Sequence, residues 1–338
     1  MVEPNTLEFP VLIGDIGGTN ARFQIVESPG ADPVRFDPVR TAQYKTPSEA
    51  IHHSVLAQTH INPKSALLAG AGPITPAGLN LTNCHWNLVP EDILSLGSIK
   101  QFVLMNDFEA QALSLPLLAE NDGELIGSSS SSALDNATKA VLGPGTGLGV
   151  GILVQAGGKW IPVAGEGGHV DIGPRNDREY AIWQRLETIA GRISGEQIIC
   201  GDGLINLYRA CCRTDATSIE LQTAAEISSA AMANSNPQAH EALHLFCTTL
   251  GRAAGDLALI SGAKGGVYIA GGIGQKILPF LKSSGFRGGF DDKAPHRSMM
   301  ETIATIVVTH PLPALLGLAA FASSPESYLI DIRIRTWQ

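Results

Sequence analysis

Two apolar segments, each interrupted by a glycine-rich turn, constrain the fold of this chain more than any other feature. In the first, residues 11–13 are followed by the run GDIGGTN at 14–20 and then by apolar residues 23–26. In the second, residues 140–142 are followed by GPGTGLG at 143–149 and then by residues 150–154. Each pattern predicts a β-hairpin, because Gly and Asn accept positive φ at little cost. The repetition indicates two related halves that each present a glycine hairpin to one ligand.

The composition of both turns is typical of a phosphate site. Without Cβ atoms, a turn brings backbone N–H groups close to a phosphate, and Thr19 adds a hydroxyl donor. Asp15 could hold a hydrated Mg²⁺ beside that phosphate, although an ordinary hairpin in which Asp15 bonds its own turn explains the first segment equally well. Two such hairpins could clamp a triphosphate without a dedicated lysine. The residues predicted to contact it are Gly14, Asp15, Ile16, Gly17, Gly18, Thr19, Gly145, Thr146 and Gly147.

Other nucleotide-binding signatures do not fit. The turn at 143–149 lacks a glycine at position 148 and returns as a strand, so it is no dinucleotide-binding fingerprint. No glycine directly precedes a Lys-Ser or Lys-Thr pair, which excludes a Walker A loop.

The remaining apolar patterns predict an α/β fold. With 338 residues, of which 44% are hydrophobic, the chain is long enough for about two domains. The five serines at 128–132 predict a surface loop. Strands are expected near 66–73, 102–105, 266–269 and 303–308, and an irregular polar stretch at 79–86. Helices are expected at 48–57 (with Ser48 as N-cap), 108–115, 180–193, 204–212, 240–259 and 314–322.

Asn106 and Asp107 follow a predicted buried strand directly. A carboxylate at the end of a strand can accept a proton from a substrate hydroxyl and orient it toward a γ-phosphate. The same two residues also suit the N-cap of the following helix, and position alone favours the cap. Both roles are compatible if Asn106 serves the turn.

Three further polar or glycine-rich sites leave alternatives open. Glu166 and His169 lie in GEGGH, where the glycines disfavour the helix that a zinc protease motif needs. They are predicted to hydrogen-bond a polyhydroxyl ligand, or else to form a solvated loop. Glu196 is either a ligand-binding group or an acid in the first turn of a helix. The turn at 270–273, with Gly271 and Gly272, could receive an adenine or ribose or simply join a strand to a helix.

Charge and composition exclude several classes of partner. The net charge of −9 argues against nucleic acid. No apolar run reaches the roughly 18 residues of a spanning helix, and the first residues do not resemble a secretory signal. Five scattered cysteines without a C-x-x-C pair predict a reduced, cytoplasmic protein without a structural zinc site.

Taken in order, the motifs resemble those of the bacterial glucokinases, within the superfamily of actin, heat-shock chaperones and sugar kinases. The resemblance spans nearly the whole chain. Unlike the related repressor-and-kinase group, with its cysteine-rich zinc motif, this chain has no cysteine between Asp171 and Ile199, which places it in the zinc-free branch. The matching segments are GDIGGTNAR at 14–22, TN at 82–83, MNDF at 105–108, the turn at 143–149, GEGGH at 165–169, GLINLYR at 203–209 and IAGG at 269–272.

The resemblance implies ATP-dependent phosphorylation of D-glucose to glucose 6-phosphate with Mg²⁺, the first step of glycolysis. Asp107 would be the general base, and Asp15 would hold Mg²⁺ through water. A smaller α/β domain (7–116 with 312–338) and a larger one (117–311) would enclose a deep cleft, as in other sugar kinases with the actin-like or ribonuclease H-like fold. A homodimer is expected. The implied glucose-binding residues are Asn106, Glu166, His169 and Glu196, and the implied adenosine motif is 270–273.

Three rival functions are compatible with parts of the pattern. A hexokinase with another sugar preference would share these motifs, because hydroxyl stereochemistry is not readable from sequence. A sugar-sensing regulator is disfavoured because only about ten residues precede the first strand, too few for a helix-turn-helix domain. A nucleotide-driven chaperone or filament protein is disfavoured by the polar cluster at 165–169.

Overall fold

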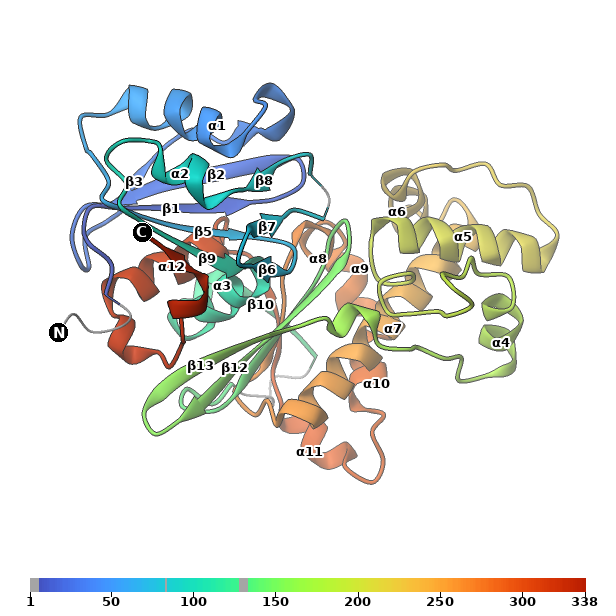
Figure 1. Cartoon of the computed structure of the whole chain (residues 1–338). Coiled ribbons are helices and arrows are strands. Elements are labelled where there is room, and N and C mark those ends of the chain that lie inside the picture. Colours follow the sequence, from blue (N-terminus) through green and yellow to red (C-terminus); the bar gives the residue numbers. More distant parts are fainter. Residues whose placement is uncertain (1–5, 83, 128–132) are drawn as a thin grey trace. The chain divides into compact units, whose positions relative to one another are not determined.

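The computed structural model describes residues 6–82, 84–127 and 133–338, and Figure 1 shows its helices and strands. The predicted serine loop at 128–132 lies outside these residues. The chain divides into two compact units, each with α/β architecture. The first unit comprises Met1–Leu118, Gly151–Ala164 and His310–Gln338, and the second comprises Ala119–Val150 and Gly165–Thr309.

The first unit is built on a sheet with the strand order β16-β9-β5-β1-β2-β3, in which β4 also pairs with β2. Its central strands β1, β5 and β9 run parallel, so their carboxyl ends share one edge of the sheet. A small separate sheet has the order β6-β7-β8. The strands are β1 (Val11–Ile16), β2 (Asn20–Val26), β3 (Val34–Arg35), β4 (Val39–Arg40), β5 (Ser65–Gly70), β6 (Ile74–Thr75), β7 (Gly78–Asn80), β8 (Asn87–Leu88), β9 (Gln101–Asn106) and β16 (Thr336–Trp337).

Helices cover both faces of this sheet (Figure 1). On one face, Ile51 of α1 and Ile93 of α2 share a core with Phe23 of β2. On the other face, α12 packs on α3 so closely that a Cβ at Gly317 would lie 2.1 Å from the carbonyl oxygen of Ala110. A glycine is therefore required at this crossing. The helices are α1 (Pro47–Ser54), α2 (Pro90–Leu94), α3 (Asp107–Ser114) and α12 (Pro313–Ser323).

The second sheet has the strand order β10-β15-β14-β11-β12-β13. Strands β11, β14 and β15 run parallel, whereas β10 pairs antiparallel with β15. Residues 151–164, which make up most of the β12–β13 hairpin, belong to the first unit. The strands are β10 (Gly123–Ile126), β11 (Lys139–Pro144), β12 (Leu148–Ala156), β13 (Lys159–Gly165), β14 (Val267–Ile269) and β15 (Thr305–Val308).

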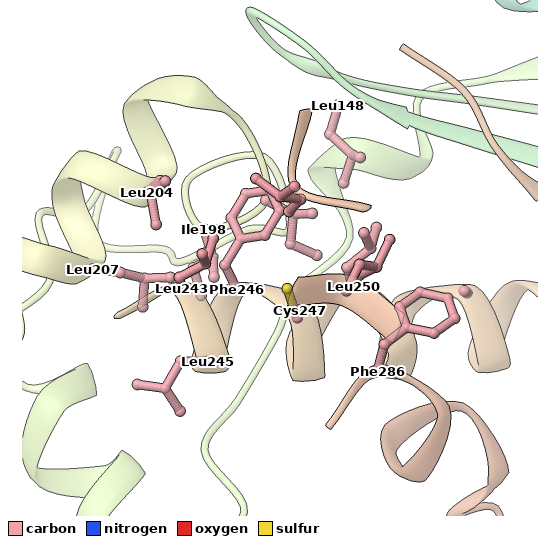
Figure 2. Close-up of a cluster of buried hydrophobic side chains, with 14 of the residues drawn as sticks. Leu148, Ile198, Leu204, Leu207, Leu243, Leu245, Phe246, Cys247, Leu250 and Phe286 are labelled. Atoms are coloured by element: carbon pink, nitrogen blue, oxygen red, sulfur yellow. The ribbon is translucent and has the colours of Figure 1, made fainter. Parts of the chain in front are cut away.

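The long helix α7 (Pro237–Ser261) organises the core of the second unit. Asn236 caps it through the N–H of Ala239, and Pro237 occupies the first helical position, where a missing N–H costs nothing. Figure 2 shows side chains of α7 packed among those of α5 and neighbouring loops. The other helices are α4 (Asp177–Trp183), α5 (Gly201–Asp215), α6 (Ala224–Met232), α8 (Gly272–Lys276), α9 (Leu278–Ser283), α10 (Phe286–Asp291) and α11 (Arg297–Thr302).

Most predicted elements are present, but three expectations were wrong. Helix α1 ends at Ser54 and is capped by Thr46, not Ser48, because the Thr46 hydroxyl accepts the N–H of Glu49. The helix expected at 180–193 is α4, which spans Asp177–Trp183, and the positive φ of Ala190 and Gly191 shows that a helix could not continue to 193. The stretch 79–86 is only partly irregular, because its first two residues belong to β7.

The described residues include no helix long and apolar enough to cross a bilayer. All five cysteines carry free thiols, and four of them are buried.

Candidate active site

In the first unit, the predicted site residues lie at the carboxyl edge of the parallel strands. Ile16 of β1, Gly70 of β5 and Asn106 of β9 occupy one row across the sheet. Two inter-strand spacings separate β1 from β9, which puts their ends about 10 Å apart. Ligands of α/β sheets bind at this edge. The turn after β1 and the residues after β9 are therefore close enough to contact one small molecule.

The turn between β1 and β2 spans residues 17–19, and the N–H of Gly17 donates to the carbonyl of Asn20 at 3.0 Å. Thr41 donates two hydrogen bonds to carbonyl groups of the turn. Its hydroxyl donates to the Gly18 carbonyl, and its N–H donates to the Thr19 carbonyl. The hairpin was predicted correctly, but its reason was not. Neither the turn residues nor Asn20 adopt positive φ, and a Cβ on Gly17 would lie 3.4 Å from the Asn20 carbonyl oxygen, so the hairpin itself does not require glycine there.

Asp15 lies opposite Arg22 in the β1–β2 register, with 3.6 Å between their charged groups. Burial raises the pKa of the Asp15 carboxyl, and Arg22 partly offsets this shift. The side chain still has 25% of its surface exposed. It therefore carries a carboxylate in a poorly solvated place, which a cation would stabilise.

Asn106 caps helix α3. Its Oδ1 accepts the N–H groups of Phe108 (2.9 Å) and Glu109 (3.2 Å), while the Glu109 carboxylate accepts the N–H of Asn106. This capping box leaves Asp107 as the first helical residue, half-buried. The N-cap role and the predicted role of general base therefore fall on different residues. Asn106 is the N-cap, and its Nδ2 group takes no part in the capping box.

A residue far along the chain fixes this turn. Arg335 forms a two-pronged pair with Glu109, with Nη1 to Oε2 at 2.6 Å and Nη2 to Oε1 at 2.9 Å. The Glu109 and Arg335 side chains are only 4% and 16% exposed. The C-terminal segment thus holds the residue that completes the cap before Asp107.

In the second unit, Glu196 joins the glycine turn after β11. The N–H of Leu148 donates to Glu196 Oε2 at 2.9 Å. A Cβ on Gly147 would lie 2.4 Å from the same oxygen, so only glycine leaves room for this carboxylate. The alternative for Glu196 was wrong, because the next helix, α5, starts at Gly201 and has Asp202 in its first turn. Thr146 is exposed at the tip of the turn.

The loop with Glu166 and His169 meets the same turn. The N–H of Glu196 donates to the carbonyl of Gly168 at 2.8 Å, and a Cβ on Gly168 would collide with the Leu148 carbonyl. Glu166 Oε2 and His169 Nε2 lie 3.8 Å apart, and both side chains are largely exposed. Arg192 secures the loop through the His169 carbonyl at 3.1 Å. The loop that carries Glu166 and His169 is therefore hydrogen-bonded to Glu196 through the backbone of Gly168.

The third glycine turn follows β14, the parallel neighbour of β11. Gly271 has a φ of +82°, and a Cβ there would lie 2.8 Å from the carbonyl oxygen of Pro144. Gly272 then begins helix α8, which confirms the strand-to-helix turn. The turns at 145–147 and 270–272 thus lie side by side at the carboxyl edge of the second sheet.

The two units present different chemistry. The first offers two carboxylates and an amide at one sheet edge, and the second offers backbone turns together with carboxylates and an imidazole. Within the described residues, no three His, Cys, Asp or Glu side chains gather into a metal cage. Polar donors and acceptors of this kind suit a polyhydroxyl ligand.

Known proteins match this chain over nearly its full length. The sequence profile of the glucokinase family matches residues 12–325. A glucokinase of Agrobacterium fabrum is 52% identical over 332 residues, covering 98% of this chain and 97% of that protein. A glucokinase of Rhizobium johnstonii is 49% identical over 342 residues, covering both chains completely.

Solved structures agree. The glucokinase of an Antarctic psychrotroph superposes with a TM-score of 0.81 and 32% identity, covering 93% of this chain and 98% of that one. A glucokinase of Balamuthia mandrillaris in complex with glucose has a TM-score of 0.76 and 24% identity, covering 93% of each chain, and supports the fold alone. From its sequence and its sugar-kinase fold, the chain belongs to the glucokinase family.

Proposed function

We propose that this chain transfers the γ-phosphoryl group of ATP to the 6-hydroxyl of D-glucose, with Asp107 as general base. The observation that carries this role is the division of labour at the start of α3. Asn106 and Glu109 complete the cap, and Asp107 stands beside it at the sheet edge where ligands bind. Glucokinases that are about 50% identical over nearly the whole chain support D-glucose as the substrate.

In the proposed reaction, Asp107 accepts the proton of the 6-hydroxyl as its oxygen attacks the γ-phosphorus. The bond from that phosphorus to the bridging oxygen of ADP breaks, and the proton leaves the carboxylate after product release. Such a transfer needs positioning and charge stabilisation more than covalent chemistry. Asn106, Glu166, His169 and Glu196 would hold the sugar hydroxyls. The solved glucokinase of Streptomyces griseus, in complex with glucose and AMPPNP, supports ATP as donor.

The nucleotide would lie on the glycine turns. Gly17, Gly18 and Thr19 in one unit and 145–147 in the other would lie against the phosphates, with 270–273 against the adenosine. The N–H groups of Gly17 and Gly145 donate within their own turns, so the N–H groups of the other turn residues would contact the phosphates. The donor set at β1 fits Mg²⁺, which proteins often hold through one or two carboxylates shared with phosphates and water. Asp15 is such a carboxylate, partly exposed and poorly solvated. When bound, Mg²⁺ would neutralise phosphate charge.

The domain boundaries at 116/117 and 311/312, a cleft between the domains, the homodimer and the cytoplasmic location all stay predictions. Sedimentation of the purified protein tests the dimer.

A coupled assay of ADP formation tests the activity across a panel of hexoses. We expect glucose to give the highest kcat/KM and omission of Mg²⁺ to abolish turnover. Preference for fructose or an N-acetylated hexosamine would point to another hexokinase. Sugar binding without ADP formation would point to a regulator.

A second prediction tests the cluster around Glu196. Changing Gly147 to alanine places a methyl group against the Glu196 carboxylate and displaces it. We expect a loss in kcat/KM for glucose of about tenfold or more, the effect of removing one charged hydrogen bond. Gly173→Ala is the matched control, because a Cβ there meets nothing within 4 Å. Equal kinetics in both variants would contradict the role of Glu196.

A further inference from the structure

A cavity of about 580 Å³ lies wholly within the first unit, away from the predicted site residues. Its walls come from α12, from the β2–β3 connection and from the segment after α3. Leu315 and Leu316 of α12 form an apolar side, and Pro33 and Pro116 extend it. The volume is that of a typical small-molecule site, and apolar walls with a few polar groups are typical of such sites.

Gln24 lines this cavity with an amide that nothing else uses. Its side chain lies on the face of β2 opposite the core formed by Ala21, Phe23 and Ile25. The residue is only 5% exposed, yet its amide makes no hydrogen bond to any residue that the structure describes. The amide atoms are not among the fully buried side-chain atoms without a partner, so they face the space of the cavity. A ligand in the cavity could therefore hydrogen-bond the amide.

Tyr328 provides a second polar group in the cavity wall. The residue is 6% exposed, and its ring packs edge-on against Phe321 of α12. Among the described residues, none hydrogen-bonds its hydroxyl. Burial raises the pKa of Tyr328 to about 12, so the hydroxyl stays a neutral donor. The cavity wall thus offers an amide and a phenol beside the apolar side chains of α12.

The mouth of the cavity is more polar. Arg35 of β3 lies directly opposite Gln24 in the sheet, so both side chains share one face. Arg35 and Asp32 are exposed, and neither forms an ion pair with any described residue. Trp160 also lines the cavity, and the N–H of Leu329 donates to its carbonyl at 2.8 Å. The lining of the cavity therefore combines exposed charged side chains with hydrogen-bonding groups on residues that are mostly buried.

We propose that this cavity is a binding site for a small amphipathic aromatic molecule. Its ring system would lie against Leu315, Leu316 and Trp160. An uncharged polar atom would hydrogen-bond Gln24 and Tyr328, and a polar or charged substituent would remain at the mouth. Because every wall belongs to the first unit, the site does not depend on the proposed kinase chemistry.

Two fluorescent probes with the same rings test this site: N-phenyl-1-naphthylamine, which is uncharged, and 8-anilinonaphthalene-1-sulfonate, which adds a sulfonate. We expect saturable binding of one N-phenyl-1-naphthylamine per chain and a rise in Tm, since a ligand of the native state stabilises it. Gln24→Met is expected to weaken binding of N-phenyl-1-naphthylamine roughly two- to tenfold through one lost hydrogen bond. Arg35→Gln is expected to weaken binding only of 8-anilinonaphthalene-1-sulfonate.

Ala319→Phe fills the cavity from α12 and is expected to abolish saturable binding of both probes. Ser323→Phe fills it from the last turn of the same helix, should the first variant not fold. Ile334→Phe, at a residue 82% exposed and outside the cavity, is the control for an added ring. Non-saturable binding, or binding that a folded cavity-filling variant retains, would overturn the proposal.

Discussion

Replacing Asp107 with asparagine is expected to lower kcat for glucose phosphorylation by about 10³-fold, within the roughly 10²–10⁴-fold contribution of a positioned general base. The amide keeps the size of the side chain but cannot accept the proton of the 6-hydroxyl. The cap of α3 belongs to Asn106 and Glu109, so the helix should persist. We therefore expect KM for glucose to change far less than kcat in steady-state assays.

Asp92→Asn is the matched control. Asp92 is an exposed acid in the first turn of α2, within the same unit. It shares with Asp107 the favourable interaction of an acid with a helix N-terminus, worth about 0.3–1 kcal/mol. Its replacement should therefore lower stability slightly and leave kcat unchanged. Near-normal kcat in a folded Asp107→Asn protein would remove this residue from the reaction.

The second large effect concerns stability. Replacing Arg335 with methionine leaves the Glu109 carboxylate buried without its partner, and we expect the free energy of unfolding to fall by about 3–5 kcal/mol. For a unit of this size, that corresponds to a loss of roughly 10 °C in Tm. Because Glu109 also accepts the N–H of Asn106, the variant should lose glucose phosphorylation too. Thermal unfolding and the coupled assay measure both effects.

Arg333→Met is the control that distinguishes the buried Arg335–Glu109 ion pair from an exposed one. Arg333 pairs with Asp331 at a similar distance, but the two side chains are 71% and 49% exposed. An exposed pair contributes about 0–1 kcal/mol, so this variant should unfold almost normally. The double variant Glu109→Met/Arg335→Met should recover stability, since apolar replacement of a buried pair is often neutral or better. Equal Tm losses at Arg333 and Arg335 would contradict the account.

The strands and glycine turns of this fold were predictable because their signals are local. Strand β9 is one apolar run that ends at Asn106, whereas its parallel pairing with β5 is a non-local feature that was not predicted. The helix at 180–193 was overestimated because apolar spacing continues past Trp183, whereas the positive φ of Ala190 depends on tertiary context.

The partners of the site residues were much harder to predict. Glu109 could have been found, because an Asn followed three residues later by Glu is a capping-box pattern. Arg335 could not, since 226 residues separate it from Glu109. The contact of Glu196 with the Leu148 N–H likewise depends on loops brought together by the fold. Thr41 and Arg192 donate hydrogen bonds to backbone carbonyl groups. Every residue has such a carbonyl, so the sequence does not show which one is the acceptor.

A crystal structure with glucose and AMPPNP tests the central claim most directly. The account predicts an Asp107 carboxylate oxygen about 2.6–3.2 Å from the 6-hydroxyl oxygen of glucose. The γ-phosphate should lie on the other side of this hydroxyl oxygen. A glucose molecule bound with its 6-hydroxyl beyond hydrogen-bonding reach of Asp107, while the nucleotide occupies the glycine turns, would contradict it.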